Sequence, residues 1–419
     1  MEATIDKARQ ERGLQIARNG KITETPIGYK VPSQSGAGSY IVKLGDEPFC
    51  SCPDFETRHL PCKHIHAVEY FTKREEMPDG TIVTTEAIRV TYNQEWSLYN
   101  NAQTHEQEHF VRLLRDLCNN IEQPKYKFGR PRLPLSDVIF GLVLKSYSTM
   151  SGRRFIADLK QAKDNGLISK AASYNSIFRY LENPELTPLL KTLIEQSASP
   201  LKAVETDFAV DSSGFATTTY DRWFDHKWGK VHSKARWLKT HLMCGVNTHV
   251  VTSVEITPLG DATQLPQLVS NTAKNFNIKE VSADKGYSSK ANLHAITSVN
   301  ATPYIPFKTN AVRNNKAQPY DSLWDKMWHY YNFNKNTFWG HYHKRSNVET
   351  TFSMIKAKFG SFVRSKLPVA QINEVLCKIL CHNICVLIQS MYELNIVPVF
   401  ETFEAKLPVA PKVLQNPDF

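Results

Sequence analysis

Apolar residues recur every three to four positions through much of residues 104–198, the spacing that gives a helix one buried face. The pattern predicts helices over residues 109–121, 135–148, 153–162 and 174–182, with further helix after Pro188. From residue 203 onward, short apolar runs predict strands over residues 208–210, 238–246 and 249–256. The pattern is irregular after about residue 300 and helical again from about 343. Strands followed by long helices predict an α/β domain in the second half.

The N-terminal part of the chain has a different pattern. Two short runs, Gly28–Pro32 and Ser39–Leu44, flank a Gly/Ser turn and predict a hairpin. Residues 62–76 are compatible with a helix that the segment Met77–Gly80 would end. We therefore expect four parts: a small unit over 1–80, a helical region over 81–200, an α/β domain over 201–395 and a tail over 396–419.

Composition adds a charge preference to this outline. The 419 residues include 51 Lys plus Arg and 41 Asp plus Glu, a formal net charge of +10. This excess suits a polyanionic partner, although a basic protein without such a partner would show it too. There is no uninterrupted run of about 18 apolar residues, and the N-terminal segment mixes acids and bases. We therefore expect an intracellular protein with neither a membrane span nor a secretory signal.

One group of cysteines has the spacing of metal ligands rather than of a disulfide framework. It reads C-x-C-x9-C-x-H and consists of Cys50, Cys52, Cys62 and His64. Three thiolates and one imidazole suit a tetrahedral zinc ion, and the pattern resembles the SWIM zinc finger. His59 and His66 are alternatives for the fourth ligand, His66 because it would share a helix face with Cys62. Such a Zn²⁺ site stabilises a small fold and catalyses nothing, because protein atoms fill every position.

Three other cysteines recur every four residues, at Cys377, Cys381 and Cys385. This spacing also allows a metal site. Because the neighbouring residues are Leu, Ile and Val, a buried helix face is the favoured interpretation. We assign these cysteines to packing.

Two acidic residues each follow a short apolar run, as expected of a side chain placed by a strand. Asp211 follows Phe208-Ala-Val and precedes small residues that would let another backbone come close. Asp284 follows Val281-Ser-Ala and has a glycine behind it. Converging carboxylates bind divalent ions that activate an attacking oxygen and stabilise a leaving one. Such hard oxygen ligands select Mg²⁺ or Mn²⁺ over Zn²⁺.

A third acid, Glu349, lies in a segment with helical periodicity. At about 100° per residue, one polar stripe within about 60° holds Tyr342, Arg345, Glu349 and Lys356, if the helix extends back to Tyr342. An adjacent apolar arc holds Val348, Phe352, Ile355 and Phe359. The helix is therefore expected to pack on a sheet and to turn its stripe toward a groove.

The spacing Tyr-x2-Arg-x3-Glu-x6-Lys resembles the C-terminal signature of insertion-sequence DDE transposases. The Asp-Ser-Ser-Gly-Phe and Asp-Lys-Gly-Tyr segments look like the first and second aspartate motifs of that family. Segments 129–133 and 173–179 look like its N-terminal helical region, so the resemblance covers about residues 125–395. It implies a ribonuclease H-like mixed sheet flanked by helices, preceded by the helical region and by a small zinc-stabilised finger.

The resemblance also implies roles for the residues. Asp211, Asp284 and Glu349 would be the catalytic ligands of Mg²⁺ or Mn²⁺, and Tyr342, Arg345 and Lys356 would hold transposon-end phosphates. The partner would be double-stranded DNA, both transposon ends and target, with a homodimer at synapsis and a cytoplasmic, nucleoid-associated location. Neighbouring acids that could be mistaken for ligands are Glu205, Asp207, Asp221, Asp225 and Asp261. Of these, Asp207 shares strand parity with Asp211.

Two segments are candidate DNA contacts outside the acidic site. Residues 223–239 interleave basic and aromatic side chains, a composition equally compatible with core tryptophans and a solvated rim. Residues 125–182 are compatible with a helix-turn-helix that would place Arg153, Arg154 and Arg179 near DNA. The alternatives to a transposase are a ribonuclease H-like nuclease without transposition and a domesticated zinc-finger DNA-binding regulator.

Overall fold

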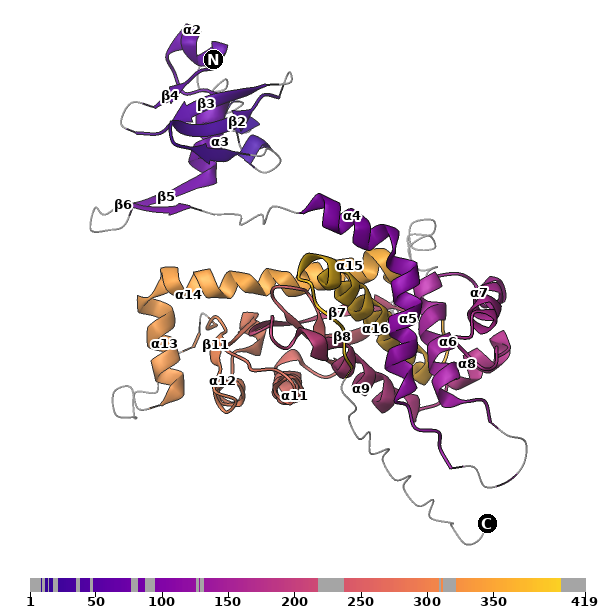
Figure 1. The fold of residues 1–419 in the computed structure, drawn as a ribbon. Coiled ribbons are helices and arrows are strands. Elements are labelled where there is room, and N and C mark those ends of the chain that lie inside the picture. The colour runs from indigo at the N-terminus through magenta and orange to yellow at the C-terminus, as the bar shows by residue number, and fades with distance from the viewer. Residues whose placement is uncertain are drawn as a thin grey trace, which may run out of the picture. The chain divides into compact units, whose positions relative to one another are not determined.

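The computed structural model describes residues 22–34, 38–45, 48–76, 82–86, 95–125, 132–217, 237–308 and 322–400, with a few shorter pieces near residues 9–17, 128 and 310. It divides the chain into two compact units, Met1–Asn93 and Gln94–Phe419. Figure 1 labels the helices and strands of each unit.

The first unit contains a four-stranded antiparallel sheet in the order β1-β2-β3-β4. Its strands are β1 (Thr23–Thr25), β2 (Gly28–Pro32), β3 (Ser39–Lys43) and β4 (Phe49–Cys50). The predicted hairpin is therefore confirmed as β2 and β3, which pair antiparallel. Two helices follow, α2 (Pro53–Arg58) and α3 (Lys63–Phe71). The core of this unit joins Val31, Val42 and Ile65 to three buried cysteines.

The helix predicted over residues 62–76 is wrong in its last turns. Helix α3 ends at Phe71, and the next five residues form strand β5 (Thr72–Glu76), which pairs antiparallel with β6 (Ile82–Glu86). The partner strand offers hydrogen bonds to the backbone, and this pairing overrides a weak helical preference. The predicted helix breaker, Met77–Gly80, lies outside the described residues.

The second unit is built on a five-stranded mixed sheet in the order β11-β10-β7-β8-β9. The strands are β7 (Asp207–Ala216), β8 (Trp237–Gly245), β9 (Val251–Ile256), β10 (Glu280–Ala283) and β11 (Thr302–Tyr304). The first three pair antiparallel, whereas β10 runs parallel to β7 and β11 runs parallel to β10. The mixed α/β architecture predicted from the sequence is confirmed.

Helices cover both faces of this sheet. Helix α11 (Asp261–Ala273) packs on β8 and β9 from one face, and α15 (Ser346–Phe359) packs on β7 and β8 from the other (Figure 1). Helix α12 (Lys290–Thr297) lies beside α11 and β11. Strand β7 is therefore central, and its side chains reach a helix on either face.

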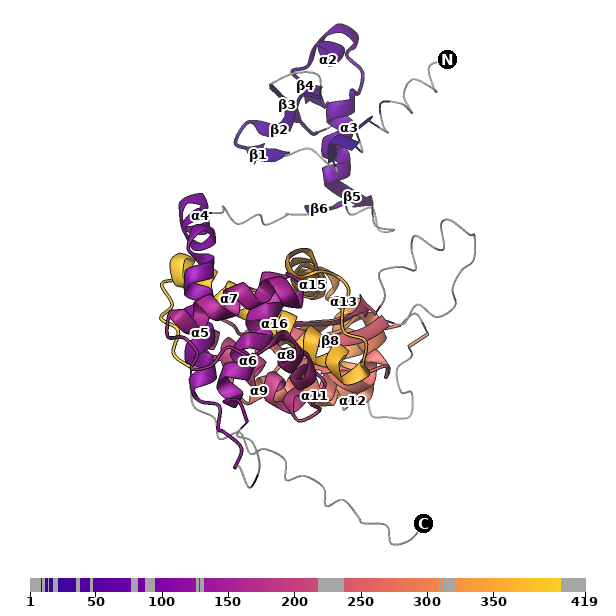
Figure 2. The same ribbon diagram turned by 90° about the vertical axis from the view of Figure 1, so that its right-hand side faces the viewer.

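The predicted helices of residues 109–198 are present, with ends shifted by a few residues. They are α5 (Glu106–Asn119), α6 (Leu135–Ser148), α7 (Gly152–Asp164), α8 (Tyr174–Leu181) and α9 (Leu186–Ala198), preceded by α4 (Trp96–Thr104). They belong to the same compact unit as the sheet, and Figure 2 shows α5, α6, α8 and α9 grouped around α16 (Pro368–Glu393).

The irregular chain predicted between about residues 300 and 343 is wrong. Two helices, α13 (Leu323–Phe333) and α14 (Lys335–Tyr342), occupy much of it. Their aromatic side chains pack around buried Phe338, whose ring centroid lies 5.0 Å from that of Tyr331 and 5.6 Å from that of Tyr304. Aromatic packing rather than an apolar stripe holds this pair of helices, so the sequence carries little helical periodicity here.

Helix α16 is the core helix of the second unit. By length and composition it could cross a membrane, but 78% of its most apolar window is buried inside the domain, against α9, α4 and α6. Polar residues such as Asn373, Lys378 and Asn383 interrupt it, so no uninterrupted apolar run is visible in the sequence. Cys377 and Cys381 are fully buried and Cys385 partly buried, which confirms the packing assignment. Burial raises the pKa of Cys377 to about 12.

Candidate functional sites

The acidic site begins with two neighbouring parallel strands. Val210 of β7 and Ala283 of β10 are register partners, so Asp211 and Asp284 follow at the same level of the sheet. The Ser212 amide donates a hydrogen bond of 2.8 Å to Asp211, and the Lys285 amide donates one of 2.6 Å to Asp284. Burial raises the pKa of Asp211, and the nearby charge of Asp284 adds to the rise. Two carboxylates of like charge therefore face a shared space.

Helix α15 supplies the third carboxylate. Its predicted apolar arc is buried, and comprises Val348, Phe352, Ile355 and Phe359. The other side of the helix leaves the Glu349 side chain 58% exposed, beside an open groove of about 490 Å³. The groove is lined by Asp211, Ser212, Ser213, Glu349, Phe352, Ser353, Lys356 and Ala357. Two of the three predicted ligands therefore line one groove, and Asp284 adjoins Asp211.

The polar stripe was aligned on the condition that one helix extends back to Tyr342, and the structure has two helices joined by a turn there. Helix α14 ends at Tyr342, and a 3₁₀ turn, η3 (His343–Arg345), joins it to α15. Backbone angles stay in the right-handed helical region, with φ −61° and ψ −36° at Tyr342 and φ −55° and ψ −33° at Arg345. Because the backbone coils in the same sense, the polar stripe continues through the turn, and Arg345 and Lys356 contact Asp211 and Ser213 at the groove.

Arg345 links the carboxylates of the sheet to that of the helix. Its Nη1 lies 2.5 Å from Asp211 Oδ2, and its Nη2 donates to Glu349 Oε1. Burial raises the pKa of Tyr342, whose phenol is close enough to Arg345 and Asp284 to interact with both charges. The guanidinium thus offsets the repulsion between acids that the fold brings together.

Lys356 lies at the other end of the stripe. Its Nζ donates a hydrogen bond of 2.6 Å to Ser213 Oγ and lies 5.4 Å from the centre of the Phe215 ring. Burial lowers its pKa. Among the described residues, no acidic side chain is paired with this ammonium. Its positive charge is therefore available to an anion that enters the groove.

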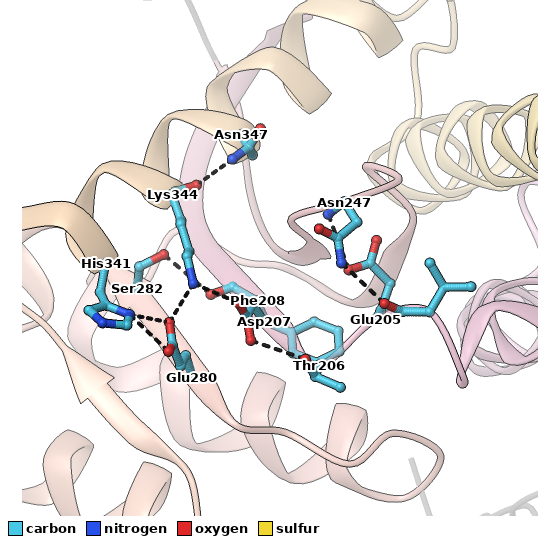
Figure 3. Close-up of polar contacts among 11 residues, drawn as sticks. Glu205, Thr206, Asp207, Phe208, Asn247, Glu280, Ser282, His341, Lys344 and Asn347 are labelled. Atoms are coloured by element: carbon cyan, nitrogen blue, oxygen red, sulfur yellow. Dashed lines mark hydrogen bonds and ion pairs between the residues drawn. The ribbon is translucent and has the colours of Figure 1, made fainter. Parts of the chain in front are cut away.

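The neighbouring acids have other partners. Buried Glu205 accepts from the Asn247 amide and from the amide and hydroxyl of Thr248, which holds a turn. Asp261 accepts from Ser212 Oγ at 2.6 Å and pairs with Lys239 at 2.8 Å. Asp207 belongs to a separate polar cluster (Figure 3). Asp221 and Asp225 lie outside the described residues.

Several polar residues around Asp211 were not predicted from the sequence. Tyr287, 1% exposed, lies next to the site, and burial raises its pKa. It falls inside the Asp-Lys-Gly-Tyr segment, where only the aspartate has an assigned role. Ser213, interpreted only as a small residue, supports Lys356 through its hydroxyl. Side-chain contacts of this kind depend on the tertiary fold, so a local motif does not reveal them.

The second candidate site lies in the first unit, where a strand end and a helix start bring four donors together. Ligand atoms of Cys50, Cys52, Cys62 and His64 all lie within 4.8 Å of one another, and all four residues are buried. His64 Nδ1 is 3.9 Å from the sulfurs of Cys50 and Cys62. Ligand atoms of a tetrahedral zinc site lie roughly 3.5–3.8 Å apart, so the cluster has the dimensions to hold this ion.

The alternative histidines are placed differently. His66 Nδ1 lies 2.8 Å from a carboxylate oxygen of Glu69, and His59 is exposed at the end of α2 with φ 53°. Neither belongs to the group of converging donors. The hydrogen bond from Cys50 lowers the pKa of Cys62 to about 4, so one thiol of the group readily ionises as a ligand.

The candidate DNA contacts are described in part. Arg153 and Arg154 are exposed on α7 and Arg179 is exposed on α8, with Arg153 5.9 Å from the centre of the Tyr174 ring. Most of the basic and aromatic segment 223–239 lies outside the described residues, as do residues 129–131. Of that segment, Trp237 is 55% exposed at the start of β8.

The sheet order, the paired aspartates and the thiol cluster define a mixed α/β domain with an acidic site, joined in one chain to a metal-binding finger. Residues 202–384 match the family model of the transposase DDE domain, and residues 40–73 match that of the SWIM zinc finger. The chain therefore carries a ribonuclease H-like transposase domain and a SWIM finger, as the sequence predicted. A search of curated proteins found no match to the chain.

Proposed function

We propose that this protein is a transposase that cuts DNA at the ends of its element and joins those ends to a target. The observation that carries the proposal is the placement of Asp211 and Asp284 at one level of adjacent strands, with Arg345 linking Asp211 to Glu349 inside a transposase DDE domain. A groove lined by two acids, Asp211 and Glu349, and by Lys356 suits a phosphodiester and its counterions.

The donor set fits a hard divalent cation. Asp211, Asp284 and Glu349 offer only carboxylate oxygens, which favour Mg²⁺ or Mn²⁺. When bound, such ions supply activation of the attacking oxygen and charge stabilisation of the leaving oxygen. The three carboxylates are the residues that would hold them.

The remaining residues of the stripe bind and orient DNA. Lys356 lines the groove with its ammonium, and Tyr342 and Arg345 hold a phenol and a guanidinium close to the aspartates. Groups of these kinds recognise phosphate oxygens. In cleavage, a water oxygen attacks the phosphorus at the element end, the bond to the 3′ oxygen breaks, and a 3′-hydroxyl is released. In transfer, that hydroxyl attacks a target phosphorus and displaces a target 3′ oxygen. No bond between protein and DNA forms in either step.

The other parts of the chain have proposed roles of their own. Zn²⁺ held by Cys50, Cys52, Cys62 and His64 stabilises the finger over residues 1–80. The helical region over 81–200 contributes DNA contacts through exposed arginines of α7 and α8, and residues 201–395 catalyse. Because two ends must be joined, we propose a homodimer at synapsis, and a DNA partner places the protein in the cytoplasm at the nucleoid.

Substitution of each carboxylate tests the proposal. Asp211→Ala, Asp284→Ala and Glu349→Ala are each expected to abolish cleavage of DNA carrying the element ends, because each removes an ion ligand. DNA binding, measured by gel shift, should remain largely intact. Glu185→Ala, which alters an exposed acid at the start of α9, is the matched control and should cleave normally. Full cleavage by any of the three variants would refute the ligand assignment.

The flanking DNA separates transposition from the alternatives. A mobile element has terminal inverted repeats and short target duplications around the gene, and these repeats supply the substrate for the assay. A ribonuclease H-like nuclease would cut without requiring such ends. A zinc-finger regulator would bind DNA and be indifferent to the three substitutions, although clustered acids without an ion cost repulsion that a binding protein has no reason to keep.

A further inference from the structure

A second acidic pair lies on the strands that carry Asp211 and Asp284. Asp207 and Glu280 are the first residues of β7 and β10 and are direct register partners. Each precedes a proposed ligand by four residues, and because side chains alternate along a strand, Asp207 faces the same side of the sheet as Asp211. Neighbouring like charges on adjacent strands repel, so this pair needs a cation.

Lys344 supplies that cation from the turn before α15. Its Nζ lies 2.6 Å from Asp207 Oδ2 and 2.8 Å from Glu280 Oε2, and Figure 3 shows the side chain reaching from η3 to both carboxylates. The three side chains are 31%, 23% and 19% exposed, so water screens them only in part. Burial acts to lower the pKa of Lys344, but the hydrogen bonds to both acids outweigh it and raise the pKa.

His341 adds a second attachment one turn earlier. Its Nδ1 lies 2.8 Å from a carboxylate oxygen of Glu280, and its ring stacks on Tyr304 at 4.4 Å between centroids and 8° between planes. The Thr206 hydroxyl donates a hydrogen bond of 3.1 Å to the other carboxylate oxygen of Asp207. The end of α14 and the η3 turn are therefore attached to the starts of β7 and β10 and to the end of β11.

The fastened turn also carries the proposed site. Arg345 is the next residue after Lys344, and Glu349 lies in the first turn of the helix that follows. We infer that Lys344 is a positioning residue: its contacts with Asp207 and Glu280 set the distance of Glu349 and Arg345 from Asp211 and Asp284. This inference deepens the proposed function and rests on it, and it assigns the cluster no contact with DNA.

The test measures Mn²⁺ binding and cleavage separately. Lys344→Met is expected to weaken Mn²⁺ binding at the acidic site roughly 10-fold and to lower kcat of end cleavage roughly 10- to 100-fold, with little change in KM for DNA. The direction of the change in Mn²⁺ affinity is informative. If Lys344→Met removed a positive charge without displacing Glu349 and Arg345, Mn²⁺ would bind more tightly. Asp211→Ala identifies which Mn²⁺ signal belongs to this site.

Matched variants separate positioning from folding. Lys344→Arg keeps a donor for both acids and should restore Mn²⁺ affinity and kcat, whereas Lys335→Met, an exposed lysine at the start of α14, should behave as wild type. If Lys344→Met does not fold, Glu280→Gln removes one partner and should give an intermediate loss. In a variant that already carries Asp207→Asn and Glu280→Gln, Lys344→Met should cause little further loss of Mn²⁺ affinity or kcat.

The outcomes distinguish two failures. Wild-type Mn²⁺ affinity in folded Lys344→Met overturns the positioning role, as does a loss confined to KM, which would make Lys344 a DNA contact. Wild-type protein that binds Mn²⁺ but does not cut element ends overturns the proposed function, while the Mn²⁺ comparison still decides the role of Lys344.

Discussion

At the scale of single residues, the acidic site is held by contacts between distant parts of the chain, since Arg345 of η3 donates to Asp211 of β7 and to Glu349 of α15. Asp211 and Asp284 stand out because each follows a short apolar run, and Glu349 because helical spacing aligns it with Arg345. The hydrogen bond between Arg345 and Asp211 spans 134 positions, so no local pattern predicts it. That these residues are catalytic stays a prediction, whereas their proximity is a property of the fold.

Lys344 illustrates the opposite case. It stands in a run of basic residues beside Arg345, and nothing in that run distinguishes a lysine engaged with two acids from a solvated one. Its partners, Asp207 and Glu280, begin two strands that the sequence places far apart. The strand parity of Asp207 with Asp211 indicated that the two side chains share a face of the sheet, but not which cation would pair with Asp207.

His382 on α16 gives the second unit a pH-dependent stability. The ring is 3% exposed, lies 2.9 Å from the His249 carbonyl through Nε2, and has its pKa lowered by burial to about 4. An unfolded histidine titrates near 6.5. As pH falls from about 6.5 to 4, the unfolded chain binds a proton that the folded chain does not, so stability present above this window is lost, by up to about 3 kcal/mol.

Urea unfolding at pH 7.5 and pH 5 measures this loss. His382→Gln keeps a donor for the His249 carbonyl and removes the titrating ring, so its free energy of unfolding should fall less over the same interval. Burial also lowers the pKa of His249, so part of the pH dependence remains in His382→Gln. An equal pH dependence in both proteins would contradict the assignment.

At the scale of elements, hydrophobic periodicity predicted the helices and strands that bury one face against the core. Helices α5 to α9 and strands β8 and β9 have such faces and were predicted within a few residues, whereas β7 continues six residues past the end predicted at Val210. Helices α13 and α14 are held by rings around Phe338, and β5 is held by pairing with β6, and both were missed. Elements that depend on distant partners carry little signal of their own.

Asn383 couples three elements through the core. Its side-chain oxygen accepts from the Val251 amide at 2.8 Å, and its nitrogen donates to the Val251 carbonyl at 2.7 Å and to the Ile194 carbonyl at 3.2 Å. Strand β9 is an edge strand, and α16 thus satisfies edge groups that would otherwise be buried without partners. The same side chain holds α9 against the sheet.

Asn383→Ala should therefore destabilise the second unit by about 1–3 kcal/mol, since it leaves buried backbone groups unsatisfied. Chemical denaturation followed by tryptophan fluorescence measures the change. Gln389→Ala, on the same helix and with its side chain hydrogen-bonded to Glu393, is the control and should stay within about 0.5 kcal/mol of wild type. A neutral Asn383→Ala would mean that water replaces the lost contacts.

At the scale of the whole molecule, the chain combines two units that are stabilised by different means. The second unit has a large apolar core, whereas the first has a small core that includes three cysteines of the candidate zinc site. Small domains bury too little surface to be stable unaided, so the first unit should depend on its ion. The two units should therefore lose structure in separate steps.

The distribution of tryptophan makes these steps separable by experiment. All seven tryptophans lie between residues 96 and 339, so their fluorescence reports on the second unit alone. A strong zinc chelator is expected to remove one equivalent of Zn²⁺ and to reduce far-ultraviolet circular dichroism and protease resistance of residues 22–71, with the tryptophan emission unchanged.

His64→Ala should reproduce this state without chelator because it removes one of four ligands. His66→Ala should keep its zinc, since His66 lies outside the converging group; zinc loss in His66→Ala but not in His64→Ala would exchange their roles. A simultaneous change in tryptophan emission would show instead that the finger supports the fold of the second unit.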